Sequence, residues 1–386
     1  MKAYAAQEPK GAAVQKHAMT TLITQTAPIA NNTHGGRAKC LQRLVRLDLP
    51  VPRTVALPFD TVLDIARGQT PDIQKIADEF PHDALLCVRP SSQDPDWGGP
   101  GAVVNIGMND ARYEFYCAQM GEGPASALYT RFVQSYAVNI ARLDPDMFDD
   151  VVGDGCEALE ASLRAYALET EESFPQDRVT QLTAVLSSMA RAWEGTSARL
   201  LRQAKGAPAD AGLGLVVQQM VFGVGTGLCG SGVLQLVDST TGLPQITGRY
   251  LSQSQGRDAL QNDADAMFLT RDPRGPSLEE HAPEAFETLT QHAALMRQRL
   301  RAEMQLEFVI SDGELFILDG VRVARSSRAA VRIAVALADE GIISREEALM
   351  RVQPRTLTEL LHRQVDPRAK RDVIGRGIAA SPGAAT

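Results

Sequence analysis

The sequence predicts an α+β fold, and two observations carry this prediction. Residues from about 111 to 205 place apolar side chains at helical spacing, whereas from about residue 213 the pattern changes to short strands and hairpins. Helices and strands that are segregated in this way are typical of α+β proteins. At roughly 150 residues per domain, the 386 residues are expected to form two or three domains or subdomains.

The first 110 residues are expected to contain one helix and one buried strand. Apart from an apolar run at 20–23, the first 30 or so residues show little pattern. A helix is expected from His34-Gly35-Gly36-Arg37 up to residues 49–52, because the prolines there cannot continue it. Residues 84–89 have the character of a strand, and a loop rich in Pro, Gly, Ser and Asp follows at 90–101.

The later elements are predicted from periodicity and from helix-start signals. A helix is expected at about 284–302, between two pairs of strands at 213–222, 232–237, 305–310 and 315–318. Short helices close the chain, because Ser344 with Glu347 and Thr356 with Glu359 match the capping box. The last twelve residues, 375–386, have the composition of a flexible linker.

The composition argues against a nucleic-acid or membrane protein. Lys and Arg number 39 and Asp and Glu 47, so the net charge is −8, and only 5% of residues are aromatic. Neither a basic stripe nor a base-stacking platform is therefore expected. The most apolar stretch, 212–228, is interrupted by Gln218, Gln219 and five glycines, and falls short of the ~20 apolar residues of a membrane-spanning helix.

Cysteine and histidine usage predicts a cytoplasmic protein without a zinc site. The five cysteines form no C-x-x-C pair, and the N-terminus lacks the apolar run of a secretory signal. Reduced thiols are therefore expected. The six histidines are scattered without metal-ligand spacing.

Residues 225–230 match the pattern G-x-G-x-x-G through Gly225, Gly227 and Gly230. A dinucleotide-binding turn requires a helix after the motif, whereas a strand-like run follows here. The motif therefore predicts a glycine-rich connection between two strands, which is either a plain hairpin or a loop whose amides can approach phosphate. Because residues 221–232 include five glycines, we expect the loop 223–230 to be mobile without ligand.

A hairpin near the C-terminal third carries two candidate carboxylates, Glu307 and Asp319, on either side of Asp312-Gly313. A two-residue turn would put Asp319 opposite Leu306 on the apolar face. A three-residue turn with a glycine bulge pairs Asp319 with Gln305 and keeps that face apolar, so we expect the three-residue turn. Gln305, Glu307 and Asp319 would then share a face, as oxygen ligands for Mg²⁺ or as a solvated sheet surface.

Two arginines are candidate phosphate ligands. Arg89 ends a buried strand before a Gly/Pro loop, and a guanidinium can hold phosphate through two hydrogen bonds. Arg37 follows Gly35-Gly36 at an expected helix start, where anions bind favourably. For each residue the alternative is a surface salt bridge.

These features occur in the order found in one protein family. From about residue 35 onward, the sequence resembles the N-terminal nucleotide-binding part of pyruvate phosphate dikinase, and more distantly phosphoenolpyruvate synthase. The resemblance is carried by GGRAKCLQRLVRLDLPVP (35–52), CVRPSS (87–92), YTRFVQSYA (129–137), VVQQMVFG (216–223), RYLSQSQGRD (249–258) and LEFVISDGELFIL (306–318). The final ASPGAAT (380–386) is similar to the start of that family's phosphohistidine domain.

The resemblance implies an ATP-grasp architecture, with two α+β subdomains around a nucleotide cleft. These subdomains would be residues 1–110 and 206–340, with a helical insert at 111–205 and a helical tail and linker at 341–386. The implied ligands are ATP and Mg²⁺, and the implied partner is a separate phosphohistidine carrier protein or domain, without nucleic acid or membrane. The implied phosphate-binding and catalytic residues are Arg37 and Arg89. The implied nucleotide-binding residues are these two arginines together with Gly225, Gly227, Gly230, Gln305, Glu307 and Asp319. The implied metal ligands are Glu307 and Asp319.

Several positions depart from the family's pattern. A lysine becomes Arg37, a glutamine becomes Asp319, arginines become Gln93, Val237 and Val321, and carboxylates become Gln305, Arg249 and Arg257. Such changes weaken the charge neutralisation on which phosphoryl transfer depends. No Thr-Ser-His sequence is present, so the carrier histidine of the family is absent from these residues.

Three functions are compatible with this pattern. The chain is a dikinase-like module for the ATP half-reaction, a catalytically degenerate paralogue that serves as a nucleotide-binding, regulatory or scaffold protein, or a different ATP-grasp phosphotransferase that acts on a small molecule. Because Arg249 and Arg257 would repel magnesium, we expect weak nucleotide binding with little magnesium dependence, and slow or absent ATP hydrolysis.

Overall fold

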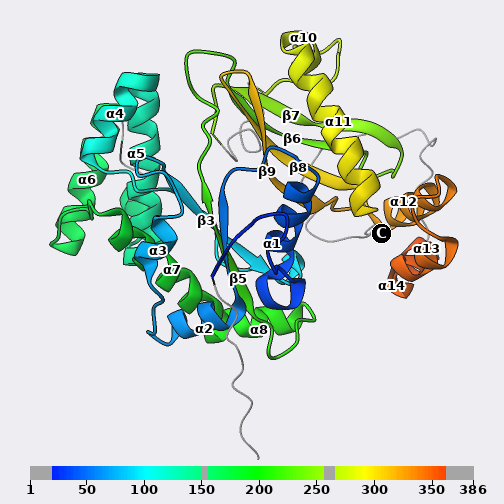
Figure 1. The fold of residues 1–386 in the computed structure, drawn as a ribbon, viewed down its shortest axis with the longest axis horizontal. Helices are drawn as coiled ribbons and strands as arrows, with labels where there is room; N and C mark the ends of the chain where they lie inside the picture. The colour runs from blue at the N-terminus through cyan, green and yellow to red at the C-terminus, as the bar shows by residue number, and fades with distance from the viewer. Residues whose placement is uncertain (1–19, 149–150, 152–154, 256–265, 362–386) are drawn as a thin grey trace, which may run out of the picture. The chain divides into compact units, whose positions relative to one another are not determined.

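The computed structural model of the protein describes residues 20–148, 151, 155–255 and 266–361 (Figure 1). Contacts between residues divide the chain into two compact units. Unit 1 comprises residues 1–234, 248–292 and 306–321, and unit 2 comprises residues 235–247, 293–305 and 322–386. The division into four parts expected from the sequence stays a prediction.

An antiparallel five-stranded sheet forms part of unit 1. Its order is β1-β2-β5-β3-β4, and every neighbouring pair runs antiparallel. The strands are β1 (Thr21–Leu22), β2 (Thr54–Leu57), β3 (Leu86–Ser92), β4 (Val103–Ile106) and β5 (Leu213–Gln219). The predicted α+β class is confirmed, whereas the ATP-grasp arrangement stays a prediction.

Strand β3 is longer than predicted, because Pro90 and Ser91 belong to the strand and not to the following loop. Pro90 lies opposite Leu215 of β5. On the other side of β3, β4 pairs only with Leu86 and Val88. Pro90 therefore has a strand partner on one side only, a position that tolerates a residue without an N–H.

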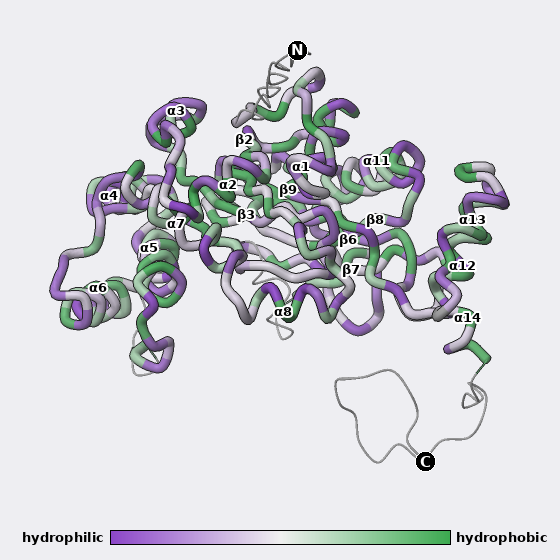
Figure 2. The backbone as a smooth tube through the Cα atoms, turned by 90° about the horizontal axis from the view of Figure 1, so that it is seen from below, coloured by the Kyte–Doolittle hydropathy of each residue, from purple (hydrophilic) through white to green (hydrophobic). Residues whose placement is uncertain are grey.

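Helices complete unit 1, and α2 to α7 bury apolar side chains in one core. These helices are α1 (Asn31–Arg46), α2 (Phe59–Ala66), α3 (Ile73–Ala77), α4 (Asp110–Met120), α5 (Glu122–Tyr136), α6 (Cys156–Thr170), α7 (Arg178–Glu194), α8 (Thr196–Ala204) and α10 (Leu278–His281). Figure 2 shows hydrophobic and hydrophilic residues alternating along α5 and α7, as expected for helices that cover a core with one side. Phe174 lies at the centre of an aromatic cluster whose other rings belong to Tyr129, Phe132, Tyr136 and Tyr166.

The second sheet has four strands in the order β7-β6-β8-β9. The strands are β6 (Gly230–Val237), β7 (Pro244–Ser252), β8 (Met304–Ser311) and β9 (Glu314–Arg322), and α11 (Pro283–Leu300) precedes β8. The boundary between the units passes through all four strands, β6, β7, β8 and β9. Strands β6, β8 and β9 and the helix match the predicted positions closely, whereas β7 was not predicted.

The β8–β9 turn corrects the predicted hairpin register. Strand β8 ends at Ser311 and β9 begins at Glu314, so only Asp312 and Gly313 lie between them, with φ of 49° and 86°. Positive φ at both central residues is the geometry of a two-residue type I′ turn, whose twist matches that of the flanking strands. The predicted three-residue turn is therefore wrong, and a two-residue turn puts Asp319 on the side that the sequence argument reserved for apolar residues.

Unit 2 contains a small helical core without aromatic residues. Helices α12 (Ser327–Asp339) and α13 (Arg345–Arg351) contribute to a cluster that includes Val237, Ile333 and Leu337. Helix α14 (Pro354–Leu361) contacts α12. The sequence ranges of this unit include no Phe, Tyr or Trp.

The two predicted capping boxes in unit 2 have different outcomes. The side chain of Ser344 accepts a hydrogen bond from the Glu347 N–H at 3.1 Å, which confirms the helix start predicted there. The prediction for Thr356 is wrong, because α14 already begins at Pro354. Proline at the first helical position has no N–H to satisfy and its fixed φ suits the helix.

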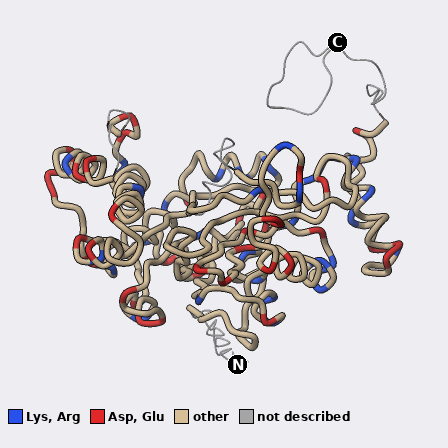
Figure 3. The backbone as a smooth tube through the Cα atoms, turned by 90° about the horizontal axis from the view of Figure 1, so that it is seen from above, with Lys and Arg blue, Asp and Glu red and all other residues tan. Residues whose placement is uncertain are grey.

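None of the described helices is both long and apolar enough to cross a membrane. All five cysteines are free. Along the described part of the chain, basic and acidic residues are intermixed (Figure 3).

Candidate functional site

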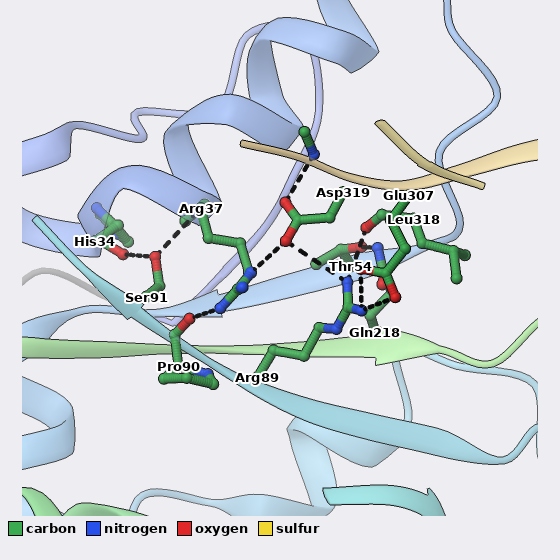
Figure 4. A network of polar contacts seen from close by, with 12 residues as sticks. His34, Arg37, Thr54, Arg89, Pro90, Ser91, Gln218, Glu307, Leu318 and Asp319 are labelled. Carbon is green, nitrogen blue, oxygen red and sulfur yellow. Dashed lines mark hydrogen bonds and ion pairs between the residues drawn. The ribbon is translucent and has the colours of Figure 1, made fainter. Parts of the chain in front are cut away.

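The candidate site is a charged network within unit 1, and Gly35 fixes its geometry (Figure 4). Gly35 interrupts α1 with φ 84° and ψ 173°. A Cβ atom at this position would lie 1.7 Å from the carbonyl oxygen of Ser91 in β3. Only glycine fits here, so α1 can lie directly against β3.

The Ser91 side chain connects β3 to α1 through two hydrogen bonds. Its hydroxyl donates to the His34 carbonyl at 2.7 Å and accepts from the Ala38 N–H at 3.0 Å. The hydroxyl thus satisfies an N–H in the first turn after the Gly35 kink, as an N-cap residue would, although it comes from a distant strand. This contact sets the direction in which Arg37 leaves the helix.

The Arg37 side chain extends from α1 to Asp319 in β9. Its Nε donates to Asp319 Oδ2 at 2.7 Å, and its Nη1 donates to the Pro90 carbonyl. Asp319 is only 3% exposed, and its other oxygen accepts the Gly320 N–H at 2.9 Å. The sequence argument rejected a register that would bury Asp319 on the apolar face. The structure buries this carboxylate, and both of its oxygens accept hydrogen bonds, as a buried charge requires.

Arg89 projects from β3 toward the same hairpin. Its Nη2 lies 2.6 Å from both carboxylate oxygens of Glu307, and its Nη1 donates to the Leu318 carbonyl at 3.2 Å. Nη1 is also 3.8 Å from Asp319 Oδ2. The two arginines and two carboxylates therefore form one network whose formal charges cancel.

The network favours the charged forms of Asp319 and Arg89 despite their burial. Burial alone would raise the pKa of Asp319, but Arg37 and Arg89 outweigh it and hold that pKa below its usual range. Burial works against the charge of Arg89, but Glu307 and Asp319 outweigh it and raise its pKa. Each ion thus depends on its partners, and removing one leaves an uncompensated buried charge.

The glycine loop connects β5 and β6, as predicted, and two of its amides have partners within unit 1. Gly223 N–H donates to Gln255 Oε1 and Gly225 N–H to Gln253 Oε1, each at 3.0 Å. A Cβ at Gly227 would lie 2.8 Å from Asp312 Oδ1, so the loop lies close to the β8–β9 turn. The expected mobility stays a prediction, and these contacts act against it.

The remaining predicted positions lie outside this network. Gln305 belongs to unit 2, where its side chain accepts from Gln235 at 2.7 Å, and Val237 is buried in the core of that unit. Arg249 is exposed on β7, and Gly230 starts β6, where a Cβ would lie 2.3 Å from the Tyr250 hydroxyl. Arg257 and residues 380–386 lie outside the described residues.

Two parts of the site were not predicted. The sequence analysis predicted that Ser91 lies in a loop. The contact of a single serine with a distant helix leaves no pattern in the sequence. His34 is 3% exposed, its Nδ1 lies 2.8 Å from the Thr33 hydroxyl, and its Nε2 has no hydrogen-bond partner among the described residues. Burial lowers the pKa of His34 and so favours the neutral ring.

The fold and the network define an α+β protein with a site of paired arginines and carboxylates at a hairpin. Sequence comparison finds that the chain is similar to one group of enzymes. The chain is similar to pyruvate, phosphate dikinases. It is 29% identical to that of Rhizobium meliloti over 394 aligned positions, covering 91% of this chain and 44% of the relative. It is 27% identical to that of Clostridium symbiosum, covering 92% and 44%, and 28% identical to the chloroplastic form of Flaveria trinervia, covering 78% and 33%.

These similarities confirm the resemblance predicted from the motifs. The chain spans less than half the length of the curated relatives that it matches. No family model matches the chain.

Proposed function

We propose that the chain is a nucleotide-binding phosphotransferase module of the pyruvate phosphate dikinase type, which performs only the ATP half-reaction. One observation supports this most directly. Arg37 and Arg89 come from different elements and meet at the carboxylates of one hairpin. Guanidinium groups that converge in this way can bind phosphate oxygens through paired hydrogen bonds.

Nucleotide binding then requires an exchange of partners. A triphosphate can replace Glu307 and Asp319 as the acceptor for Arg89 and Arg37, since all are oxygen anions. The exchange costs the existing ion pairs, so we propose weak binding, in the high micromolar to millimolar range. The ATP-grasp arrangement of the surrounding elements is part of the same proposal.

The carboxylates do not fit magnesium as they are arranged. Both oxygens of Glu307 accept from Arg89, and the oxygens of Asp319 accept from Arg37 and the Gly320 N–H. Among the described residues, no group of three or more His, Cys, Asp or Glu side chains could hold a metal ion. The metal role proposed for Glu307 and Asp319 therefore requires both arginines to move away first, and nucleotide affinity should depend little on magnesium.

Calorimetric titration with ATP, with and without magnesium, tests the proposal. Arg89→Ala removes a phosphate contact and should weaken ATP affinity by about tenfold or more. Arg53→Ala is a matched control, because Arg53 pairs with Glu79 at an exposed site of the same unit. Equal ATP affinity in wild type and Arg89→Ala, or no binding at millimolar ATP, would overturn the proposed site.

The closed network also favours a second candidate, a degenerate paralogue with a regulatory or scaffold role. All four carboxylate oxygens of Glu307 and Asp319 already accept a hydrogen bond, so the network is self-sufficient without ligand. A phosphohistidine domain from a related dikinase separates the candidates. Rapid phosphorylation of that domain by ATP supports the kinase module, whereas binding without transfer supports the degenerate paralogue.

A further inference from the structure

A small hollow in unit 2, separate from the arginine–carboxylate network, has the chemistry of a ligand site. It is open to solvent, and the space within it and at its mouth together is about 330 Å³. Its walls come from the two residues before β8, from the end of β9 and the segment after it, and from α12 and α13. Its lining includes Glu303, Arg322, Arg325, Ile333, Leu337 and Arg351. All of these residues belong to the same unit.

Glu303 is the residue that requires explanation. Its side chain is only 5% exposed, and its Oε1 accepts from Arg297 Nε at 2.6 Å. Its Oε2 is buried and has no hydrogen-bond partner among the described residues. A buried carboxylate oxygen without a donor costs free energy, so the hollow needs a hydrogen-bond donor at this point.

The same hollow has an excess of positive charge. Its lining has three arginines and one glutamate, a formal charge of +2. Arg351 shares its charge with Glu347 at 2.6 Å. Arg322 is exposed and forms no hydrogen bond or ion pair within the described part of the chain. The exposed rim with Arg322 therefore attracts an anionic group, while the buried end at Glu303 attracts a hydrogen-bond donor.

The third part of the lining is apolar. Ile333 and Leu337 project from α12 together with two alanines. From these three features we propose that the hollow binds a small carboxylic acid with a neighbouring amino or hydroxyl group and a short apolar side chain. The amino or hydroxyl group donates to Glu303, the carboxylate pairs with Arg322, and the side chain contacts Ile333 and Leu337.

Calorimetry on the full chain with four probes tests this assignment. L-Alanine and L-lactate carry both groups, propionate lacks the donor, and L-alaninamide lacks the carboxylate. We expect L-alanine, L-lactate or both to bind about tenfold or more tightly than propionate and L-alaninamide. Binding of alanine alone identifies an amino acid, and binding of lactate alone identifies a hydroxy acid.

Two results would overturn the proposal. If propionate binds as tightly as the other acids, the hollow recognises only an anion. If none of the four binds at millimolar concentration, a water molecule is sufficient to satisfy Glu303.

Variants locate the binding. Arg322→Ala should lower the affinity by about tenfold, because it removes the carboxylate's partner. Arg345→Ala, at an exposed position of α13 outside the lining, should leave it unchanged. Glu303→Gln should weaken the binding of alanine more than the binding of lactate, because the ammonium group of alanine loses its counter-charge. If Glu303→Gln does not fold, Arg322→Ala still tests the site, because Arg322 is exposed. Equal affinity of wild type and Arg322→Ala for the acids would refute the site.

Discussion

Asp319 shows how one buried carboxylate can determine both a hairpin and a site. It is held by Arg37 at 2.7 Å and by the Gly320 N–H at 2.9 Å, and it lies 3.8 Å from Arg89. In Asp319→Asn both arginines lose a buried counter-charge. We expect this variant to be less stable by about 3 kcal/mol at pH 7.

The effect of Asp319→Asn should depend on pH in one direction. The pKa of Asp319 is lower in the folded protein than its usual value of 3.8. Its contribution to the free energy of unfolding is therefore complete above about pH 4 and is lost as pH falls through the lower folded pKa. Guanidinium denaturation of wild type and variant between pH 7 and pH 3 should show the two curves converging at the acid end.

Asp210→Asn is the matched control, because Asp210 is exposed in a loop of the same unit. It should change stability by less than about 0.5 kcal/mol at every pH. A constant difference between wild type and Asp319→Asn across the pH range would show that the ionised carboxylate is not the source of the stability.

The sequence located the members of the site but not their partners. Arg37, Arg89, Glu307 and Asp319 were all named as candidates, and the structure brings all four together. They were expected to face phosphate and magnesium, whereas here they bind one another. Pairs that are 282 and 218 residues apart in sequence cannot be inferred from spacing, because the fold alone decides which charges meet.

At the scale of elements, the contact between α1 and β3 depends on Gly35. We expect Gly35→Ala to destabilise the protein by at least about 2 kcal/mol, since it combines a left-handed φ with a collision against the Ser91 carbonyl. Gly68→Ala is the control, because Gly68 has a similar φ of 87° and open space around its Cβ. It should cost about 1 kcal/mol.

Equilibrium denaturation in guanidinium measures both glycine variants. If Gly35→Ala costs no more than Gly68→Ala, then the close approach of α1 to β3 has no energetic consequence. Nucleotide affinity of Gly35→Ala should also fall, because the helix positions Arg37.

The glycine loop permits a second prediction about an element. The Gln253 side chain accepts from the Gly225 N–H, and the Gln255 side chain accepts from the Gly223 N–H. Gln253→Ala should therefore accelerate amide hydrogen exchange at Gly225 and leave Gly223 nearly unchanged, which exchange measured by NMR can resolve. If Gly225 already exchanges at the rate of an unprotected amide in wild type, the loop is mobile, as the sequence predicted.

Elements with a clear periodicity were predicted, whereas two strands without clear alternation were not. Helix α11 was expected at about 284–302 and lies at Pro283–Leu300. Strand β2 has only four residues, all buried, and follows a proline-rich segment, so no alternation marks it. Strand β7 begins with the exposed Pro244 and Gln245, so its sequence gives little sign of a strand.

At the scale of the whole molecule, we expect these 386 residues to form no phosphoenolpyruvate from pyruvate, phosphate and ATP. They contain no Thr-Ser-His sequence, and they span less than half of the dikinases they resemble. A coupled assay for phosphoenolpyruvate, with a complete dikinase as positive control, measures this. Turnover by the purified chain would contradict the half-reaction proposal.

The absence of aromatic residues from unit 2 determines what spectroscopy can observe. Both tryptophans belong to unit 1, where Trp193 is 2% exposed beneath the Arg202 guanidinium, 3.6 Å from the ring centroid. Intrinsic fluorescence and near-ultraviolet circular dichroism therefore report unit 1 alone, whereas far-ultraviolet circular dichroism also records α12, α13 and α14. Overlaid melting curves from the two methods would reveal one cooperative transition, and separated curves would reveal that the helices without aromatic residues melt on their own.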